Sequence, residues 1–124
     1  MKEHSPSFVA LAKEAKSHIE ETDIYTVKKM MDNEEDFELV DVREESEWDE
    51  GHLPSAIHLG KGIIERDIEK VIPNRNRKLI LYCGGGFRSA LAAESVKKMG
   101  YKNVLSMDGG FRAWREAGFP IIMD

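Results

Sequence analysis

The stretch that decides the fold is Leu79-Ile80-Leu81-Tyr82-Cys83-Gly84-Gly85-Gly86-Phe87-Arg88-Ser89-Ala90-Leu91. An apolar run of strand character ends at the only cysteine in the chain, and three glycines, a phenylalanine and an arginine follow it. The alanine-rich segment after them predicts a helix over 89–99, which stops at a glycine. A continuous apolar run is typical of a central parallel strand that is covered on both faces. The stretch therefore predicts an α/β domain with a thiol between a strand and a helix N-terminus.

Segments on either side of this stretch extend the α/β pattern. Further strands are predicted at 24–25, 37–42, 56–59 and 104–107. Helices are predicted at 6–20, where Ser5 and Pro6 form the start signal, at 26–31, 44–50 and 64–72, and after the turn 108–110. Strands that alternate with helices imply right-handed crossovers. We therefore expect a five-stranded, mainly parallel sheet with helices on both faces, and Trp48 and Trp114 among the core residues.

Polar residues stand at the ends of three of these strands. Cys83 follows one strand, Asp41 and Arg43 end another, and Asp108 comes just past a third. Ligands of open parallel sheets bind outside the carboxyl ends of the strands. The predicted topology alone thus brings these chemically useful side chains to one edge of the sheet.

Composition limits the classes of function. The 124 residues are 41% hydrophobic and 33% charged, which fits a single globular domain. A net charge of −5 argues against nucleic acid as a partner, and no run approaches the roughly 20 apolar residues of a membrane span. The N-terminus lacks the apolar segment of a secretory signal, so we expect a reducing cytoplasm. Four histidines and one cysteine form no metal-ligand pattern, and neither metal nor cofactor is expected.

The loop after Cys83 has the composition of an anion pocket. A cysteine acts as a nucleophile in its thiolate form, whereas a free thiol with a pKa of about 8.5 is mostly protonated at neutral pH. Gly84, Gly85 and Gly86 allow successive amides to turn inward, and the following helix adds the positive end of its dipole. Both features favour a thiolate. Arg88 either binds an incoming oxyanion or braces the loop from outside, and the alternative for Cys83 is a purely structural cysteine in a glycine-rich turn.

Four motifs, in this order and spacing, resemble the rhodanese family of sulfurtransferases over residues 20–122. They are 39–44 (LVDVRE) with Glu47 and 51–57 (GHLPSAI), 82–89 (YCGGGFRS), 107–114 (MDGGFRAW) and 117–120 (AGFP). The predicted N-terminal helix lies outside the family core. We therefore divide the chain into an N-terminal helical extension, 1–22, and a rhodanese domain, 23–124.

The resemblance implies a persulfide mechanism at Cys83. The thiolate would take the outer sulfur of a donor such as thiosulfate and pass it to an acceptor, which is cyanide, a cellular thiol or a protein. The resemblance assigns the active-site loop to Gly84, Gly85, Gly86, Phe87 and Arg88. Asp41 and Arg43 are expected to fix this loop from the neighbouring strand end, with an exposed surface ion pair as the alternative for Arg43.

Two other classes of protein compete with a sulfurtransferase. Related cysteine phosphatases and arsenate reductases place five residues between cysteine and arginine, but only four separate Cys83 from Arg88 here. The shorter loop suits a sulfur atom better than a phosphoryl group. The other rival is a sulfur-relay or regulatory binding module. Glycines at 84 and 85, where thiosulfate-preferring relatives often carry a basic side chain, leave the physiological donor open.

Overall fold

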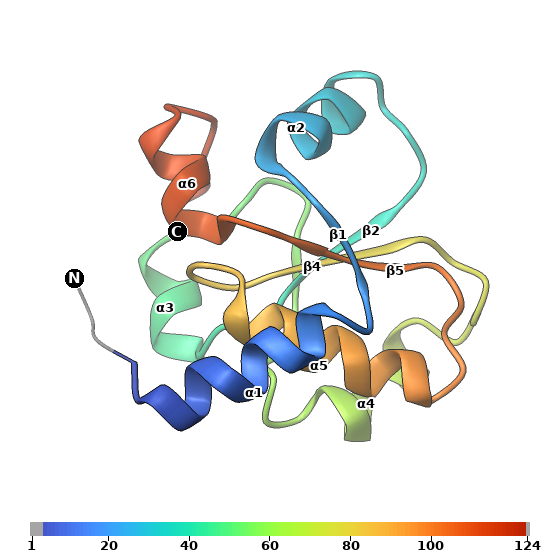
Figure 1. The fold of residues 1–124 in the computed structure, drawn as a ribbon. Coiled ribbons are helices and arrows are strands. Elements are labelled where there is room, and N and C mark those ends of the chain that lie inside the picture. The colour runs from blue at the N-terminus through green and yellow to red at the C-terminus, as the bar shows by residue number, and fades with distance from the viewer. Residues whose placement is uncertain (1–3, 124) are drawn as a thin grey trace.

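A five-stranded parallel sheet forms the centre of the molecule in the computed structural model, which describes residues 4–123 (Figure 1). The strand order is β1-β5-β4-β2-β3, and every neighbouring pair is parallel. The elements are α1 (Pro6–Lys16), β1 (Glu20–Thr22), α2 (Ile24–Asp32), β2 (Glu38–Asp41), α3 (Glu45–Glu50), β3 (Ile57–His58), α4 (Ile64–Val71), β4 (Leu79–Tyr82), α5 (Phe87–Lys98), β5 (Val104–Met107) and α6 (Gly110–Glu116). The predicted fold class is confirmed.

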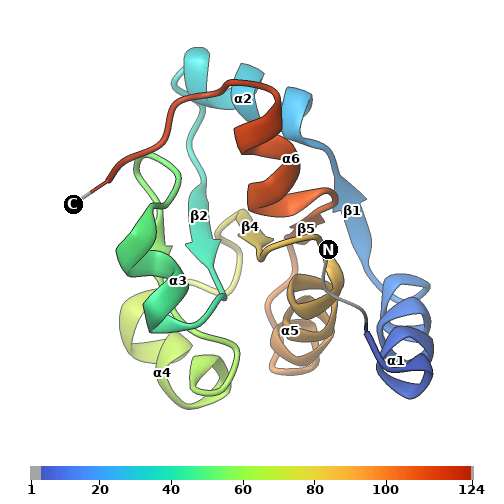
Figure 2. The ribbon, with the colours of Figure 1, turned by 90° about the vertical axis from the view of Figure 1, so that its left-hand side faces the viewer.

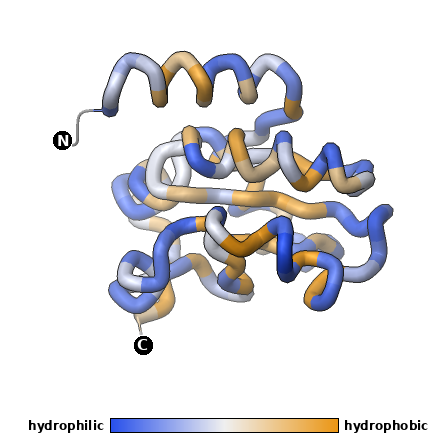
Figure 3. The backbone as a smooth tube through the Cα atoms, turned by 90° about the horizontal axis from the view of Figure 1, so that it is seen from below, coloured by the Kyte–Doolittle hydropathy of each residue, from blue (hydrophilic) through white to orange (hydrophobic). Residues whose placement is uncertain are grey.

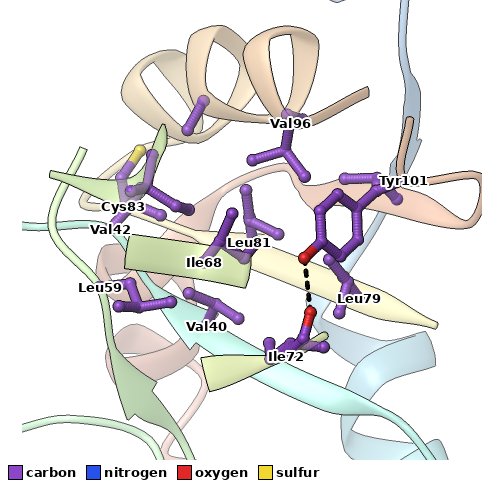
Figure 4. Close-up of a cluster of buried hydrophobic side chains, with 14 residues drawn as sticks. Val40, Val42, Leu59, Ile68, Ile72, Leu79, Leu81, Cys83, Val96 and Tyr101 are labelled. Atoms are coloured by element: carbon purple, nitrogen blue, oxygen red, sulfur yellow. Dashed lines mark hydrogen bonds between the residues drawn. The ribbon is translucent and has the colours of Figure 1, made fainter. Parts of the chain in front are cut away.

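Helices cover both faces of the sheet and enclose two hydrophobic cores. In Figure 2, α2 and α6 lie on one face of the sheet, and α4, α5 and α1 lie side by side on the other. Alternate residues of β4 point to opposite faces: Leu79 and Leu81 join the core under α4 and α5, whereas Ile80 and Tyr82 join the core under α2 and α6. Cys83 continues the first set and lies at the end of that core (Figure 4).

Capping side chains fix where the first two helices begin. Ser5 Oγ accepts the Phe8 N–H at 3.2 Å, and Pro6 occupies the first helical position, as the sequence predicts. Asp23 caps α2 by accepting the Thr26 N–H at 2.8 Å. The cap explains why the strand predicted at 24–25 is wrong, because Ile24 is the first residue of α2 and its side chain is buried in the core.

The first strand lies earlier than predicted. Residues 20–22 form β1 and pair with β5 at the edge of the sheet, so α1 ends at Lys16 instead of residue 20. This short strand has the sequence Glu-Glu-Thr and is largely exposed. It therefore carries none of the apolar alternation by which strands are recognised. The division of the chain at residue 22 stays a prediction, although part of that extension pairs within the sheet.

The two tryptophans lie in different environments. Trp114 is fully buried, as predicted, and its indole N–H donates to Pro120 O at 2.8 Å. Trp48 is only half-buried and does not join either core. Its ring instead stacks on His52 with centroids 3.6 Å apart, and on His58 at 5.1 Å. The prediction of a core Trp48 is therefore wrong, because its helix lies beyond the carboxyl end of the sheet and not over a face.

Across residues 4–123, none of the helices combines the length and the apolar character that crossing a membrane requires.

Candidate active site

The carboxyl ends of β2, β4 and β5 bring the predicted polar residues to one edge of the sheet. Asp41 lies opposite Tyr82 in the parallel register of β2 and β4, so Arg43 and Cys83 follow neighbouring strand ends. Asp108 follows β5, and its N–H donates to Thr22 O at 2.9 Å. The convergence that the topology predicted is present.

The sulfur of Cys83 lies at the base of the loop with only 1% of the residue exposed. The Gly86 N–H donates to Sγ at 3.1 Å. The thiol itself donates to Ser89 Oγ at 3.5 Å, and Ser89 Oγ lies 2.7 Å from Ser106 Oγ. After loss of the thiol proton, Ser89 can reverse its role and donate to the sulfur, with Ser106 donating to Ser89 in turn. The site therefore offers an amide and a hydroxyl to a thiolate.

The loop backbone is held by the turn that precedes α6. The N–H groups of Phe111 and Arg112 donate to Cys83 O at 2.8 Å and to Gly84 O at 3.0 Å. A Cβ on Gly110 would overlap the Cys83 carbonyl, so only glycine allows this approach. With these carbonyls engaged, the amides of Gly84 and Gly85 have no acceptor within residues 4–123. They remain available to an anion.

Gly86 makes the corner between the loop and α5. It adopts a φ of 113° and serves as the N-cap, so α5 begins at Phe87, two residues before the predicted start. A side chain at this position would be strained and would meet Asp108 Oδ1 at 3.1 Å. The first turn of α5 thus points its unpaired N–H groups toward the loop that holds the sulfur.

Arg88 pairs with Glu47, which favours the bracing role among the two that the sequence left open, and it also lines the cavity with Cys83. Its Nη1 and Nη2 donate to Glu47 Oε1 at 2.7 Å and Oε2 at 3.0 Å. These hydrogen bonds lower the pKa of Glu47 to about 2, against the opposing effect of burial. They also raise the pKa of Arg88. The pair links α3 to the start of α5, and the positive charge of Arg88 is balanced.

Asp41 and Arg43 form a buried network behind the loop. Arg43 is 4% exposed and donates from Nε and Nη2 to the Asp41 carboxylate at 2.8–3.1 Å, so the alternative of an exposed ion pair is wrong. Arg43 Nη2 also donates to Gly51 O at 2.7 Å. Tyr82 donates to Asp41 Oδ2 at 2.6 Å and accepts the Leu53 N–H at 3.1 Å. Burial, together with Asp41, raises the pKa of Tyr82.

A cavity of about 810 Å³ opens above the sulfur. Its lining combines the loop with residues of α3, α6 and the N-terminal helix: Glu44, Ser46, Glu47, Cys83, Gly84, Gly85, Phe87, Arg88, Arg112, His4, Ser5 and Phe8. Arg112 also lines a second hollow of about 340 Å³ beside it. Arg112 is exposed and has no carboxylate partner in the described part of the chain.

The predicted site did not include seven of these lining residues, among them Arg112, His4 and Phe8. Arg112 had a usable signal, because it follows the glycine turn at the end of β5, where ligands of parallel sheets bind. His4 and Phe8 had none, since only the packing of α1 on α5 brings them to the cavity. In residues 4–123 no cluster of His, Cys, Asp and Glu is arranged to hold a metal ion.

Comparisons with known proteins agree with this geometry. The family model described as the rhodanese-like domain matches residues 23–117. A sulfurtransferase of Allochromatium vinosum is 31% identical over 84% of this chain and 95% of its own length. The thiosulfate sulfurtransferase GlpE of Coxiella burnetii is 30% identical over 80% of the chain and 84% of its own. YrkF of Bacillus subtilis, named as a sulfur carrier, is 33% identical over 79% of the chain, which spans about half of its length.

Among solved structures, a Rhodopseudomonas palustris protein of unknown function superimposes with a TM-score of 0.83. It is 33% identical, and the match covers 98% of this chain and 99% of that one, so it includes the N-terminal helix. Its description names a tyrosine phosphatase as one candidate function. The family model, the full-length sulfurtransferase relative and the parallel sheet lead to one assignment: this chain belongs to the rhodanese-like domain family of sulfurtransferases.

Proposed function

We propose that the protein transfers a sulfane sulfur from thiosulfate or a similar donor to a thiophilic acceptor through a persulfide on Cys83. The observation that carries the proposal is the environment of Sγ. It accepts the Gly86 N–H, and the neighbouring amides of Gly84 and Gly85 have no internal acceptor in residues 4–123. Such a set of donors stabilises a thiolate and a persulfide anion without a general base.

Each half-reaction balances in charge and atoms. The Cys83 thiolate attacks the outer sulfur of thiosulfate and forms a new S–S bond, and the original S–S bond breaks with its electron pair leaving on sulfite. Cyanide or a thiolate acceptor then attacks the terminal sulfur of the persulfide. The Cys83–S bond breaks, and its electron pair returns to the cysteine as thiolate. No proton transfer to or from carbon and no cofactor is required.

Arg112 is the cation that we assign to donor recognition. Arg88 is neutralised by Glu47, whereas Arg112 lies at the rim of the cavity beside the loop, where a Cβ on Gly85 would lie 3.6 Å from its Nη1. The backbone N–H of Arg112 donates to Gly84 O, and this hydrogen bond fixes the Arg112 backbone beside the loop. The guanidinium is therefore suited to the oxyanion end of a sulfur donor.

The name of the Coxiella relative supports thiosulfate as donor, and the name of YrkF supports transfer to a protein acceptor as the alternative use of the same persulfide. Phosphatase chemistry receives less support. It requires an arginine that reaches the phosphoryl group from within the loop, and Arg88 is instead held by both oxygens of Glu47. A single free thiol suits a reducing compartment, and we place the reaction in the cytoplasm.

Mass spectrometry of the intact protein after incubation with thiosulfate tests this proposal. We expect one added sulfur on wild type, removed again by cyanide with release of thiocyanate. Cys83→Ser should neither gain sulfur nor release thiocyanate, with activity lowered by about a thousandfold or more. Equal activity of the two proteins would overturn the proposal. If another sulfane donor loads the protein and thiosulfate does not, the persulfide mechanism stands and thiosulfate is excluded as the donor.

A further inference from the structure

The N-terminal helix is anchored to the domain by its middle and its C-terminal end. Ala12 and Ala15 are its buried residues, and α1 packs along α5 (Figure 2). Beyond its end, His18 pairs with Glu94 at 2.8 Å, and Lys97 Nζ donates to His18 O at 3.1 Å. Figure 3 shows hydrophobic residues of α1 interrupted by hydrophilic ones, as expected of a helix with one buried side. The first turn of α1 contributes none of these buried residues.

That first turn instead contacts the candidate active-site loop. The rings of Phe8 and Phe87 meet edge-on with their centroids 6.0 Å apart. The ring of His4, which precedes the helix, has its centroid 5.1 Å from that of Phe8 and 5.5 Å from that of Phe87. Lys16 adds a second connection, because its Nζ lies 5.5 Å from the Phe87 ring and 3.0 Å from Asp108 Oδ1. The helix thus touches the residue that opens α5 directly after the sulfur-holding glycines.

The ring cluster gives the cavity above Cys83 an apolar side. His4, Phe8 and Phe87 line it together with Cys83. The charged residues of the lining are Glu44, Glu47, Arg88 and Arg112. A volume of about 810 Å³ falls in the range of roughly 300–1,000 Å³ that holds drug-sized ligands. Thiosulfate and cyanide are far smaller. Neither of them covers an aromatic surface, so the cavity is larger and more apolar than these two reactants require.

We propose that α1 forms the acceptor-selecting side of the site, with Phe8 as a specificity-determining residue. The Phe8 side chain would favour small thiol acceptors that carry an aromatic or aliphatic group next to the sulfur. The proposal rests on the persulfide chemistry proposed above and names the acceptor class for it. The apolar group packs against Phe8 and Phe87, and the acceptor sulfur reaches the terminal sulfur on Cys83.

The transfer itself follows the second half-reaction. The acceptor thiolate attacks the terminal sulfur, a new S–S bond forms, and the bond to Cys83 breaks with its electron pair returning to the cysteine. The product is an organic persulfide. No oxidant or reductant is consumed, because the sulfane sulfur is exchanged between two thiolates.

Acceptor competition in Phe8 variants tests the proposal. Protein loaded with thiosulfate is mixed with benzyl mercaptan, 2-mercaptoethanol or cyanide, and the products are trapped with iodoacetamide and quantified by mass spectrometry. For Phe8→Gln, we expect kcat/KM with benzyl mercaptan to fall about fivefold, chiefly through KM, because an aromatic contact is lost. The values for 2-mercaptoethanol and cyanide should change less than about twofold. Phe8→Leu, which keeps an apolar side chain, should retain most of the benzyl mercaptan activity.

Leu11→Ala supplies the matched control. Leu11 is on the same helix, is 57% exposed and does not line the cavity, so all three acceptors should react as with wild type. An equal loss with all three acceptors in Phe8→Gln, or no change with benzyl mercaptan, overturns the acceptor proposal. Failure of wild type to load sulfur from any donor would instead refute the proposed function. The cyanide reaction of each variant reports whether its Cys83 site is folded.

Discussion

The carboxyl ends of β2 and β4 lie side by side and use their polar groups in opposite ways. At the end of β2, Asp41 accepts hydrogen bonds from Arg43 and Tyr82, Arg43 donates to Gly51 O, and Tyr82 accepts from Leu53. At the end of β4, the carbonyls of Cys83 and Gly84 accept N–H groups at the start of α6, while the amides of Gly84 and Gly85, which line the cavity, have no acceptor in residues 4–123. The polar groups at the end of β2 are therefore mostly paired within the protein, although Arg43 also lines the hollow of about 340 Å³. At the end of β4, two loop amides are unpaired in residues 4–123.

This contrast shows which polar groups mark a binding site. A buried ion pair such as Asp41–Arg43, whose hydrogen bonds are mostly made within the protein, has little hydrogen-bonding capacity left for a ligand, however strong its charges. Backbone amides held in place but unpaired keep that capacity, and their geometry exists before the ligand arrives. We therefore infer that the residues at the end of β2 stabilise the fold and that the loop at the end of β4 binds the reactants. Substitutions at the two ends should separate stability from sulfur transfer.

Removing the carboxylate of Asp41 should have the largest effect on folding. Asp41→Ala leaves the Arg43 guanidinium buried with only Gly51 O as its remaining hydrogen-bond partner, and we expect the free energy of unfolding to fall by about 3–5 kcal/mol. Urea unfolding followed by circular dichroism measures it. Asp32→Ala, which breaks the surface pair with Lys28, is the control and should cost below about 0.5 kcal/mol. Equal losses in both variants would contradict a structural role for the network.

Features of the fold that depend on local sequence pattern were predictable, and those that depend on long-range pairing were not. The apolar run of β4 and the alternation of strands with helices predicted the parallel sheet and placed Cys83 at its carboxyl edge, because both depend on local pattern. The polar edge strand Glu20–Thr22 was missed, since pairing with β5 alone makes it a strand. Its neighbour Ile24 looked like a strand residue, and the Asp23 cap made it helical.

Within the candidate site, local and long-range features were predictable to different degrees. The glycine loop and its cysteine are contiguous in sequence, so their chemistry was visible there. Whether Arg88 faces the ligand or Glu47 depends on where α3 lies, 41 positions away along the chain. Phe8 reaches the cavity only because α1 packs on α5. No periodicity or motif encodes that approach.

The second-largest effect is expected from a side chain at Gly110, which would displace the Cys83 loop at the end of β4. The added Cβ of Gly110→Ala would overlap the backbone of Cys83 and Gly84, so the loop must shift. We expect a loss of about 1–3 kcal/mol of stability, and sulfur loading slowed by about a hundredfold, because displaced amides no longer meet the sulfur. Gly62→Ala, where no atom lies within 4 Å of the new Cβ, is the control. Normal loading in Gly110→Ala would show that the loop geometry is not needed.

The smallest effect is expected at the ion pair that closes the loop from outside. Glu47→Gln removes the charge opposite Arg88 but keeps an oxygen that can accept the Glu44 N–H. Because about a third of each side chain faces water, solvent screens the pair, and its contribution to unfolding is about 1 kcal/mol or less at pH 7. Glu45→Gln, an exposed position of the same helix, serves as the control.

The pH dependence identifies this contribution. The pKa of Glu47 is lowered from 4.5 to about 2 in the folded protein, chiefly by its hydrogen bonds with Arg88. Between these values the unfolded chain binds the proton and the folded one does not, so stability rises with pH across that window. The difference in unfolding free energy between wild type and Glu47→Gln should therefore be constant above about pH 5 and shrink as the pH falls toward 2. Urea unfolding at several pH values measures it, and a difference that grows on acidification would contradict the assignment. Arg88 thus resembles Arg43 in having a carboxylate partner but differs from it in exposure. Water screens the Arg88–Glu47 pair, and we therefore expect it to contribute less to stability than the buried Arg43–Asp41 pair.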